Sequence, residues 1–317
     1  MKLTKVDEGF AFIGDEDVPS CHASSIAQLP DGTLVAVWYA GKEEGSPDSG
    51  EYMAVKRPNA DGWHPYRVFI NVPDWPAGNP RIYLDAAGRL VVMYTICYGR
   101  WCRADTLYTR FSTNGALTWS RPREIPFNPK VLGKNPPVVY PDGRIVAPIT
   151  VENMDYGASC IISDDNGETW RMVGALRGRE EGQRVLQPTI APLADGSLLM
   201  LLRTNMDRIW RSRSTDRGET WSPPEPTDLP HNRSGICMIR HSSGNVFLAL
   251  NPVAEGRTPL AIFRSPDEGA SWHEAVMLED GPGEYSYPTL IEGIGGLIHI
   301  IYTWRRERIK WAALRID

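Results

Sequence analysis

The feature that most constrains the fold is an eight-residue motif, Ser-x-Asp-x-Gly-x-Thr-Trp, that occurs three times and once more in degraded form. The three good copies are residues 163–170 (SDDNGETW), 214–221 (STDRGETW) and 265–272 (SPDEGASW), and the degraded copy is residues 112–119 (STNGALTW). Their final tryptophans follow one another at 51-residue intervals, at positions 119, 170, 221 and 272. A period of this length is typical of propeller blades. Each copy predicts a scaffold turn between two strands, in which Asp accepts backbone hydrogen bonds, Gly takes a positive φ and Trp packs on its own hairpin.

A second series of glycine-containing turns sets the number of units. These turns are Asp31-Gly32, Ala87-Gly88, Asp142-Gly143, Asp195-Gly196, Ser243-Gly244 and Gly295-Gly296, at intervals of 48 to 56 residues. Each interval holds four short strands, so we predict an all-β fold: a six-bladed β-propeller with four-stranded blades, forming a single domain over residues 1–317. The last unit is one strand short. A strand around residues 9–13 near the N-terminus is expected to complete it and so close the ring.

Composition narrows the classes of partner. The formal net charge is -5, which argues against a general affinity for nucleic acid or for an anionic membrane surface, so an acidic ligand would need local Arg or Lys. The five cysteines form no Cys-x-x-Cys pair, so neither a zinc site nor a disulfide framework is expected. The first residues lack the apolar segment of a signal peptide, and cytoplasmic residence is the default expectation unless a leader has been removed.

The repeat places polar residues at one rim of the central channel. The residues that precede the innermost strand of each unit are His22, Asn79, Asn135, Gln187, Ser234 and Tyr287. The loops after the second strands should reach the same rim, and they carry Glu43, Glu44, Asp48, Cys97, Arg100, Trp101, Glu152, Arg203, Asn251, Arg257, Tyr302, Trp304 and Arg306. Loops on a rigid scaffold are the usual carriers of function, so this end of the ring is the predicted site.

These motifs resemble those of the sialidase-type propellers, which carry such Asp boxes on six blades. The resemblance covers essentially the whole chain and implies a fold more firmly than a substrate. In sialidases three arginines hold the sugar carboxylate, a Tyr activated by a Glu is the nucleophile, and an Asp in an early loop is the acid/base. By this resemblance Arg203 and Arg257 match two of the arginines, Tyr287 matches the nucleophile, and Asp48 falls in the region of the loop Asp.

The sequence departs from the sialidase pattern at two catalytic positions. His22 stands where the first arginine is expected, and Gln187 stands where the Glu that activates the Tyr is expected. Without that Glu, Tyr287 lacks the base that would make it a nucleophile, because an unperturbed phenol has a pKa of about 10. An imidazole with an ordinary pKa of about 6.5 suits a general base instead.

Three further stretches are similar to a branch of this superfamily that includes rhamnose–glucuronate lyases. They are residues 134–137 (KNPP), 285–288 (YSYP) and 302–306 (YTWRR) with Ile309-Lys310. The resemblance implies β-elimination at the glucuronate of an acidic oligosaccharide. We expect His22 to be the base and Tyr287 the acid, or the reverse, with Arg203 and Arg257 on the carboxylate.

The remaining rim residues are expected to bind and orient the substrate. They are Glu44, Asp48, Asn79, Lys134, Asn135, Gln187, Ser234, Asn251, Tyr302, Trp304 and Arg306. The scheme requires neither a metal ion nor a cofactor. Two alternatives stay open: a sialidase-like glycoside hydrolase that uses Glu44, Asp48 or Glu152, and a noncatalytic sugar-binding propeller.

Overall fold

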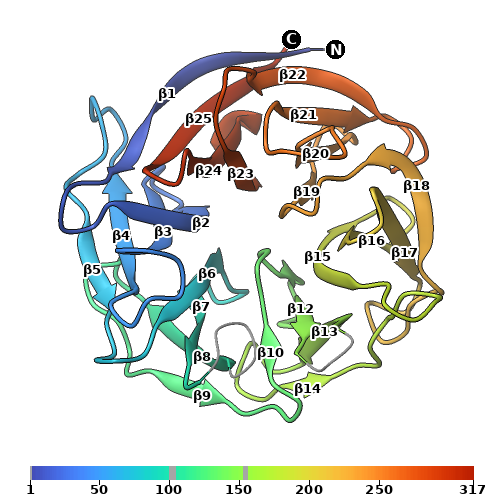
Figure 1. The fold of residues 1–317 in the computed structure, drawn as a ribbon, viewed down its shortest axis with the longest axis horizontal. Coiled ribbons are helices and arrows are strands. Elements are labelled where there is room, and N and C mark those ends of the chain that lie inside the picture. The colour runs from blue at the N-terminus through green and yellow to red at the C-terminus, as the bar shows by residue number, and fades with distance from the viewer. Residues whose placement is uncertain (1, 100–104, 153–155) are drawn as a thin grey trace.

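The computed structural model describes residues 2–99, 105–152 and 156–317 and consists of six antiparallel sheets arranged in a ring (Figure 1). Within each sheet, strands that are consecutive in sequence lie side by side. The prediction of an all-β, six-bladed propeller with four-stranded blades is confirmed. The one helical element in the described part is a short 3-10 turn, η1 (Ile294–Gly296). No helix among the described residues is both long and apolar enough to cross a membrane.

Each blade runs from an innermost strand at the channel to an outermost strand at the periphery. The first three blades are β2 (Ser20–Gln28), β3 (Leu34–Gly41), β4 (Gly50–Lys56), β5 (Arg67–Ile70); β6 (Ala77–Leu84), β7 (Leu90–Cys97), β8 (Asp105–Ser112), β9 (Arg123–Ile125); and β10 (Val131–Leu132) with β11 (Val138–Val139), β12 (Ile145–Val151), β13 (Gly157–Ser163), β14 (Arg171–Met172). In the third blade β10 and β11 both pair with β12, so its innermost strand is interrupted.

The other three blades follow the same order. They are β15 (Val185–Pro192), β16 (Leu198–Thr204), β17 (Arg208–Ser214), β18 (Glu225–Pro230); β19 (Cys237–Arg240), β20 (Val246–Leu250), β21 (Leu260–Ser265), β22 (His273–Glu279); and β23 (Tyr285–Glu292), β24 (Ile298–Trp304), β25 (Arg308–Ile316) with β1 (Leu3–Ile13) on its outer edge.

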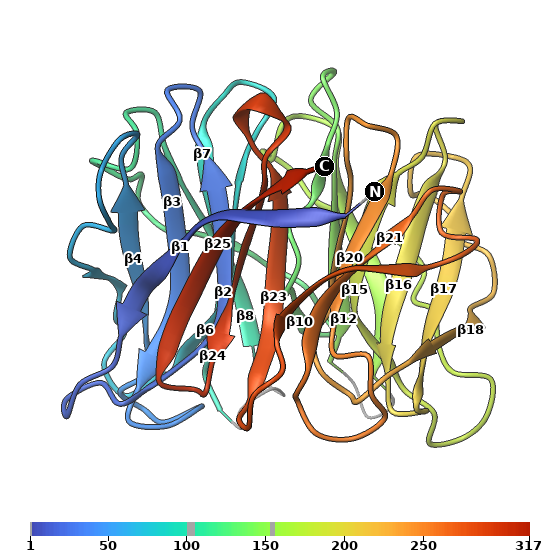
Figure 2. The same ribbon diagram turned by 90° about the horizontal axis from the view of Figure 1, so that it is seen from above.

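The N-terminal strand closes the ring, as the sequence predicts. β1 pairs antiparallel with β25 from Leu3 opposite Ile316 to Ile13 opposite Arg308, so the two ends of the chain meet on the sixth blade (Figure 2). The outermost strand of the last blade therefore comes from the start of the chain, and the sixth sheet reaches the same four-stranded width as the others.

Apolar side chains fill each of the six interfaces between neighbouring blades, one core cluster to an interface. Between the sixth and first blades, for example, Phe12 and Trp38 pack with their ring centroids 5.4 Å apart. The Asp boxes contribute to this packing. Gly269 has φ +89°, and a Cβ added there would lie 2.5 Å from Leu199 Cδ2 of the preceding blade.

Hydrogen bonds also join each blade to the next near the channel. They are Ile82 N–H to Ser25 Oγ (3.1 Å), Arg81 Nη1 to Pro148 O (2.6 Å), Asn135 Nδ2 to Pro188 O (2.9 Å), Met238 N–H to Thr189 Oγ1 (2.9 Å), Leu290 N–H to Cys237 Sγ (3.3 Å) and Thr289 Oγ1 to Ser24 O (2.8 Å). Together they form a closed circle around the axis, so the innermost strands are fixed relative to one another. Side chains carried by these strands therefore stand on a rigid frame.

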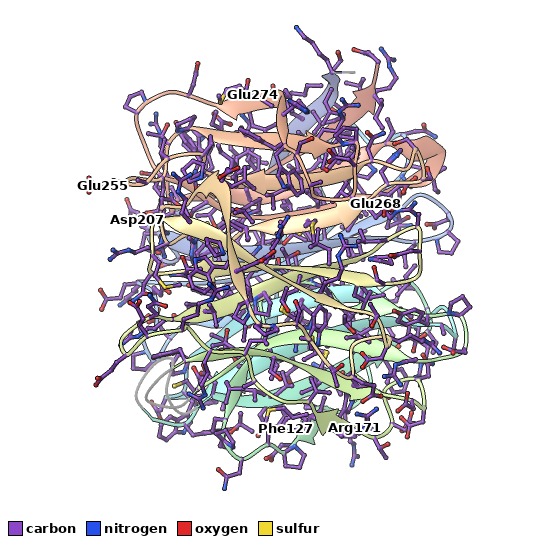
Figure 3. All side chains as sticks on the ribbon, turned by 90° about the vertical axis from the view of Figure 1, so that its right-hand side faces the viewer. Phe127, Arg171, Asp207, Glu255, Glu268 and Glu274 are labelled. Carbon is purple, nitrogen blue, oxygen red and sulfur yellow. The ribbon has the colours of Figure 1, made fainter. Side chains whose placement is uncertain are left out.

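The ring has two distinct ends. We call the end where the innermost strands begin the mouth, and the end that carries the Asp boxes the Asp-box end. In the side view of Figure 3, Asp207 and Glu255, from loops at the mouth, project from one edge, whereas Glu268, from an Asp box, lies toward the opposite edge.

Candidate active site

Four innermost strands carry a β-bulge at the same point, just inside the mouth. The register shifts there between His22 and Ser25, Gly78 and Arg81, Leu186 and Thr189, and Ser286 and Thr289. The residues inside the bulges have a left-handed backbone: Ala23 (φ 52°), Asn79 (φ 52°), Gln187 (φ 41°) and Tyr287 (φ 53°). Such a conformation is strained for a residue with a side chain, and bulges re-aim side chains. The same local strain thus recurs in four blades at the rim where the chemistry was predicted.

The bulges correct the predicted alignment of the blades. Asn79, Gln187 and Tyr287 occupy equivalent positions, but in the first blade the equivalent residue is Ala23, so His22 lies one residue earlier than predicted. In the fifth blade Gly235 stands at that position and Ser234 precedes it. A side chain there would be crowded, because a Cβ would lie 3.2 Å from both Tyr287 Cγ and Lys134 Cε.

His22 nevertheless meets Tyr287 at the centre of the mouth. The centroids of their rings are 4.1 Å apart, and the ring of Tyr39 stands edge-on to His22 at 5.8 Å. His22 Nδ1 lies 2.9 Å from the hydroxyl of Thr303, which also accepts a hydrogen bond from the N–H of Ala23. The imidazole is therefore held by both a ring contact and a hydrogen bond.

The environment of His22 keeps its imidazole neutral. The side chain is buried, and burial is the largest cause that lowers its pKa well below the usual 6.5. The positive charges of Arg306, Arg257, Arg203 and Lys134 lower the pKa further. This differs from the ordinary pKa that the sequence led us to expect. A bound anion would offset those charges and make protonation of His22 less costly.

Arg203 connects Tyr287 to Gln187. Its Nη1 donates to Tyr287 Oη at 2.5 Å and to Gln187 Oε1 at 2.6 Å. In the part of the chain that the structure describes, no carboxylate pairs with this guanidinium, and its Nε is buried without a hydrogen-bond partner. The geometry brings together three predicted site residues and leaves Arg203 with uncompensated charge.

A network that the sequence did not predict holds the other two arginines. Glu284 Oε1 accepts hydrogen bonds from Arg257 Nη1 and Arg306 Nε, both at 2.6 Å. Arg306 also bonds to Glu44 at 2.5 Å, and Glu44 in turn bonds to Tyr39. Burial would raise the pKa of Glu284, but the charges of Arg257 and Arg306 outweigh it and hold that pKa below its usual value. Glu284 therefore stays ionised and positions both guanidinium groups.

Lys134 does not lie among the groups at the mouth but spans the channel beneath them. Its Nζ donates to Asn135 Oδ1 at 3.0 Å, to Ile236 O of the fifth blade at 3.4 Å, and to Pro288 O of the sixth. Burial lowers its pKa from 10.5 to about 8. Lys134 is only 4 % exposed and its ammonium is bonded to three oxygens. The side chain therefore closes the channel below the mouth and is not free to bind the carboxylate of a ligand.

Below Lys134 lies a cavity of about 650 Å³ toward the Asp-box end. Its lining is mainly apolar and includes Ile26, Ile82, Ile190 and Leu290. The groups that can transfer protons or bind anions gather above Lys134 instead. We therefore place the candidate site at the mouth and not in this cavity.

Several predicted residues are placed away from the central cluster or are already engaged. Tyr302 is buried between blades, where its hydroxyl bonds to Glu279 at 2.7 Å, and Trp304 packs against Phe10 at 5.8 Å. Neither reaches the mouth, because β24 directs both side chains into the packing around its own sheet.

Two predicted binding residues have their amide nitrogens committed to the backbone. Asn135 donates to Pro188 O as part of the circle of interblade bonds, and Asn251 donates to the carbonyl oxygens of Pro259 and Tyr285. Ser234 is fully buried, with its hydroxyl unpaired in the described structure. Asn79 lies at the rim, in the bulge of the second blade.

The loop between β3 and β4 holds Asp48 by hydrogen bonds. Asp48 is exposed, and its Oδ2 accepts the N–H of Lys42 at 3.0 Å. Burial raises its pKa, but the bonds from Ser46 and Lys42 together outweigh burial and leave the pKa below its usual value. Of the other predicted rim residues, Glu152 accepts the N–H of Asp105 at 3.3 Å, and Arg100 and Trp101 lie outside the described residues.

The balance of charge at this end favours an anion. Four cations act on His22, namely Arg203, Arg257 and Arg306 at the mouth and Lys134 beneath them, and with the two carboxylates Glu44 and Glu284 they leave a net charge of +2 (four minus two). This local excess contrasts with the negative charge of the whole chain and makes the mouth suited to an acidic ligand. Within the described ranges, no group of three or more His, Cys, Asp or Glu side chains could hold a metal ion.

Solved structures with the same fold include sialidases. A Hadza microbial sialidase superposes with a TM-score of 0.84 at 18% identity, over 96% of this chain and 68% of that one. A Dyadobacter fermentans protein of unknown function gives 0.83 at 16% identity, over 99% of both chains. A leech intramolecular trans-sialidase gives 0.80 at 15% identity, over 97% of this chain and 70% of that one. At these identities the likeness concerns the fold.

A match to a family model shows the family to which the chain belongs. The model for the BNR repeat-like domain matches residues 32–300, which is most of the chain and includes all four Asp boxes. The blades and boxes described above are those of this family. The chain belongs to the BNR repeat-like domain family, as its repeated Asp boxes predict.

Proposed function

We propose that this protein is a carbohydrate-active enzyme that acts on an acidic oligosaccharide, and that it removes the group on O4 of a terminal glucuronate by β-elimination. The observation that carries the proposal is the surroundings of Tyr287. Its hydroxyl bonds to Arg203, which also holds the amide of Gln187. A guanidinium and an amide thus stand where a tyrosine nucleophile would need a carboxylate base.

The electrostatic requirement of an elimination fits these groups. Removal of the C5 hydrogen of a uronate develops negative charge on its carboxylate, and fixed cations lower that barrier. Arg203 and Arg257 both lie over the ring of Tyr287, with guanidinium carbons 5.7 and 5.6 Å from its centroid. A carboxylate placed between them would receive charge-assisted hydrogen bonds from both sides.

The proton transfers are assigned to the two rings in contact. Neutral His22 accepts the C5 proton, the C4–O4 bond breaks as the C4=C5 double bond forms, and Tyr287 donates its proton to the leaving oxygen. The imidazolium and phenolate so formed face each other in rings 4.1 Å apart, so one proton transfer restores the starting state. The carboxylate of the substrate offsets the surrounding cations while His22 carries its proton.

A sialidase-like hydrolase is the second candidate. The solved neighbours named for an activity are a sialidase and an intramolecular trans-sialidase, and the first-blade loop offers the exposed carboxylates of Glu44 and Asp48. Hydrolysis would need one of them to act across the scissile bond from Tyr287. The low pKa of Asp48 works against the role of a general acid.

The test is to incubate the protein separately with a rhamnosyl-glucuronate-capped oligosaccharide and with sialyllactose. Elimination gives an unsaturated uronate that absorbs in the ultraviolet, hydrolysis gives an ordinary reducing sugar, and a purely binding protein gives neither. We expect His22→Ala to abolish elimination. The matched control is His299→Ala, another buried histidine that stacks on Trp311 with ring centroids 5.8 Å apart, away from the mouth. Near-normal elimination by His22→Ala would remove His22 from the mechanism.

A further inference from the structure

An aromatic pair at the mouth end of the second blade has no role in the chemistry above. Trp75 is 39% exposed and Tyr98 is 43% exposed, and their rings meet edge to face with centroids 5.5 Å apart. Large apolar side chains that are exposed singly need no explanation, but aromatic side chains exposed in contact with each other do. In the described residues only one other aromatic side chain is as exposed, Phe111, and it stands alone on β8.

The backbone fixes this pair beside the proposed site. Trp75 forms a β-bridge with Val72 and lies two residues before the start of β6, whereas Tyr98 directly follows the end of β7. The N–H of Cys97 donates to Pro76 O at 3.0 Å and ties the two segments together. Asn79 in the bulge is four positions after Trp75, so the distance between their Cα atoms is at most about 14 Å. The pair therefore stands on the same rim as the catalytic groups.

Behind the pair lies a cleft with the chemistry of a sugar site. The cleft has a volume of about 300 Å³, and its mixed lining combines the aliphatic side chains of Ile70, Val72 and Ile96 with Asn71, Arg110 and three tyrosines, Tyr94, Tyr98 and Tyr108. The hydroxyls of Tyr98 and Tyr108 are 3.1 Å apart, and the rings of Tyr94 and Tyr108 are stacked at 5.8 Å. Flat rings with hydroxyls at their edges provide both the apolar face and the hydrogen bonds that a pyranose needs.

We propose that Trp75 and Tyr98, with the tyrosine cleft behind them, form an outer subsite that binds a sugar residue beyond the acidic end of the substrate. The inference rests on the proposed function for the identity of that acidic end. Because the subsite binds a sugar beyond the acidic end, the natural substrate is an oligosaccharide or polysaccharide chain rather than a disaccharide. The occupant is a neutral or weakly polar sugar ring, because the lining carries a single cation, Arg110, whose Nε already donates to Ser120 O at 2.8 Å.

The test compares two probes with the same glucuronate end, a disaccharide and a hexasaccharide, by isothermal titration calorimetry. We expect the intact protein to bind the hexasaccharide about tenfold more tightly than the disaccharide, and Trp75→Ala or Tyr98→Ala to remove most of that ratio. Trp75→Phe should keep most of it, because a flat ring remains. The matched control is Phe111→Ala, which removes an aromatic ring of equal exposure and should keep the ratio.

Equal affinities for the two probes, no measurable binding of the hexasaccharide, or an unchanged ratio in both Trp75→Ala and Tyr98→Ala would overturn the outer subsite. The proposed function is read separately, from product formation. If binding depends on the length of the probe and on Trp75 but no product forms, the outer subsite is supported and the proposed enzymatic activity is refuted. If product forms but the two probes bind equally well, the activity is supported and the outer subsite is refuted.

Discussion

The two ends of the ring use the same kinds of residue in opposite ways. At the Asp-box end, charges are paired: Arg144 bonds to Asp164 and to Glu219 at 2.5 Å, and Arg217 bonds to Asp142 at 2.6 Å. The box aspartates are likewise saturated. Asp216 bonds to Ser214 and Thr220, and although burial raises its pKa, these bonds lower it to about 2. At the mouth, by contrast, Arg203 has no carboxylate partner among the described residues, and its Nε is buried without a hydrogen-bond partner.

This contrast distinguishes the residues that stabilise the ring from the residues that are candidates for function. Paired charges make the Asp-box end a scaffold, whereas an uncompensated positive charge is costly and is typical of a site that binds an anion. The two ends should therefore respond oppositely to substitution. Changes at the mouth should affect turnover more than stability, and changes at the Asp-box end should affect stability more than turnover.

The largest effect is expected from Arg203→Met at the mouth. Loss of the guanidinium that bonds to Tyr287 should lower kcat/KM for the acidic substrate by about a thousandfold, because fixed charge at the developing enediolate is lost. The midpoint of thermal unfolding should stay the same or rise, since an unpaired cation is removed. The control is Arg211→Met on the adjacent strand, which breaks a surface pair with Glu225 and should leave kcat/KM unchanged. A kcat/KM within tenfold of normal in Arg203→Met would contradict the assignment.

The complementary change at the Asp-box end is Gly269→Ala. Its φ of +89° and the 2.5 Å approach of the new Cβ to Leu199 should lower the free energy of unfolding by about 2–3 kcal/mol. The kcat/KM of the protein that remains folded should not change. Urea denaturation measures the first effect, and Gly174→Ala serves as control, because a Cβ there meets nothing within 4 Å. A Gly269→Ala variant as stable as Gly174→Ala would show that the boxes do not hold neighbouring blades together.

A smaller effect is expected from Lys134, which lies between the two ends. Its folded pKa of about 8 lies below the unfolded value of 10.5, so between these values the unfolded chain holds a proton that the folded chain has released. Stability from this group therefore rises with pH in that window, by about 1 kcal/mol from pH 8 to pH 9. Comparison of urea denaturation of the intact protein and of Lys134→Met at the two pH values should show this rise only in the intact protein. An identical pH dependence would mean that the ammonium is not buried as described.

The scaffold could be predicted from the sequence more completely than the mouth. The Asp boxes recur at fixed spacing and their local chemistry is self-contained, so they determine the blades directly. The alignment of the mouth depends on bulges, which hydrophobic alternation does not encode. One sequence signal was available: Asn79, Asn135, Gln187 and Tyr287 each precede a proline, and His22 and Ser234 do not.

The residues that the sequence did not reveal act through tertiary contacts. Glu284 bonds to Arg257 and Arg306, which are 27 and 22 residues away in the chain, and Thr303 reaches His22 across 281 residues. No local sequence pattern distinguishes this glutamate or this threonine from the other glutamates and threonines of the chain. Only the closed ring, which brings the sixth blade against the first, makes them neighbours of the site.

The smallest expected effect is also the one that best separates the two candidate reactions. Asp48 lies on the first-blade loop at the mouth, yet it resembles the Asp-box aspartates in that backbone and hydroxyl bonds hold it ionised. If the reaction is an elimination by His22 and Tyr287, Asp48→Asn should change kcat/KM by less than about threefold, because an amide still accepts the N–H of Lys42. If the reaction is a hydrolysis with Asp48 as the acid, the same change should lower kcat/KM by about a hundredfold or more. The control is Asp74→Asn, which changes an aspartate on the loop that leads into the second blade. A large loss of kcat/KM in Asp48→Asn but not in Asp74→Asn would assign the mouth to a sialidase-like hydrolase.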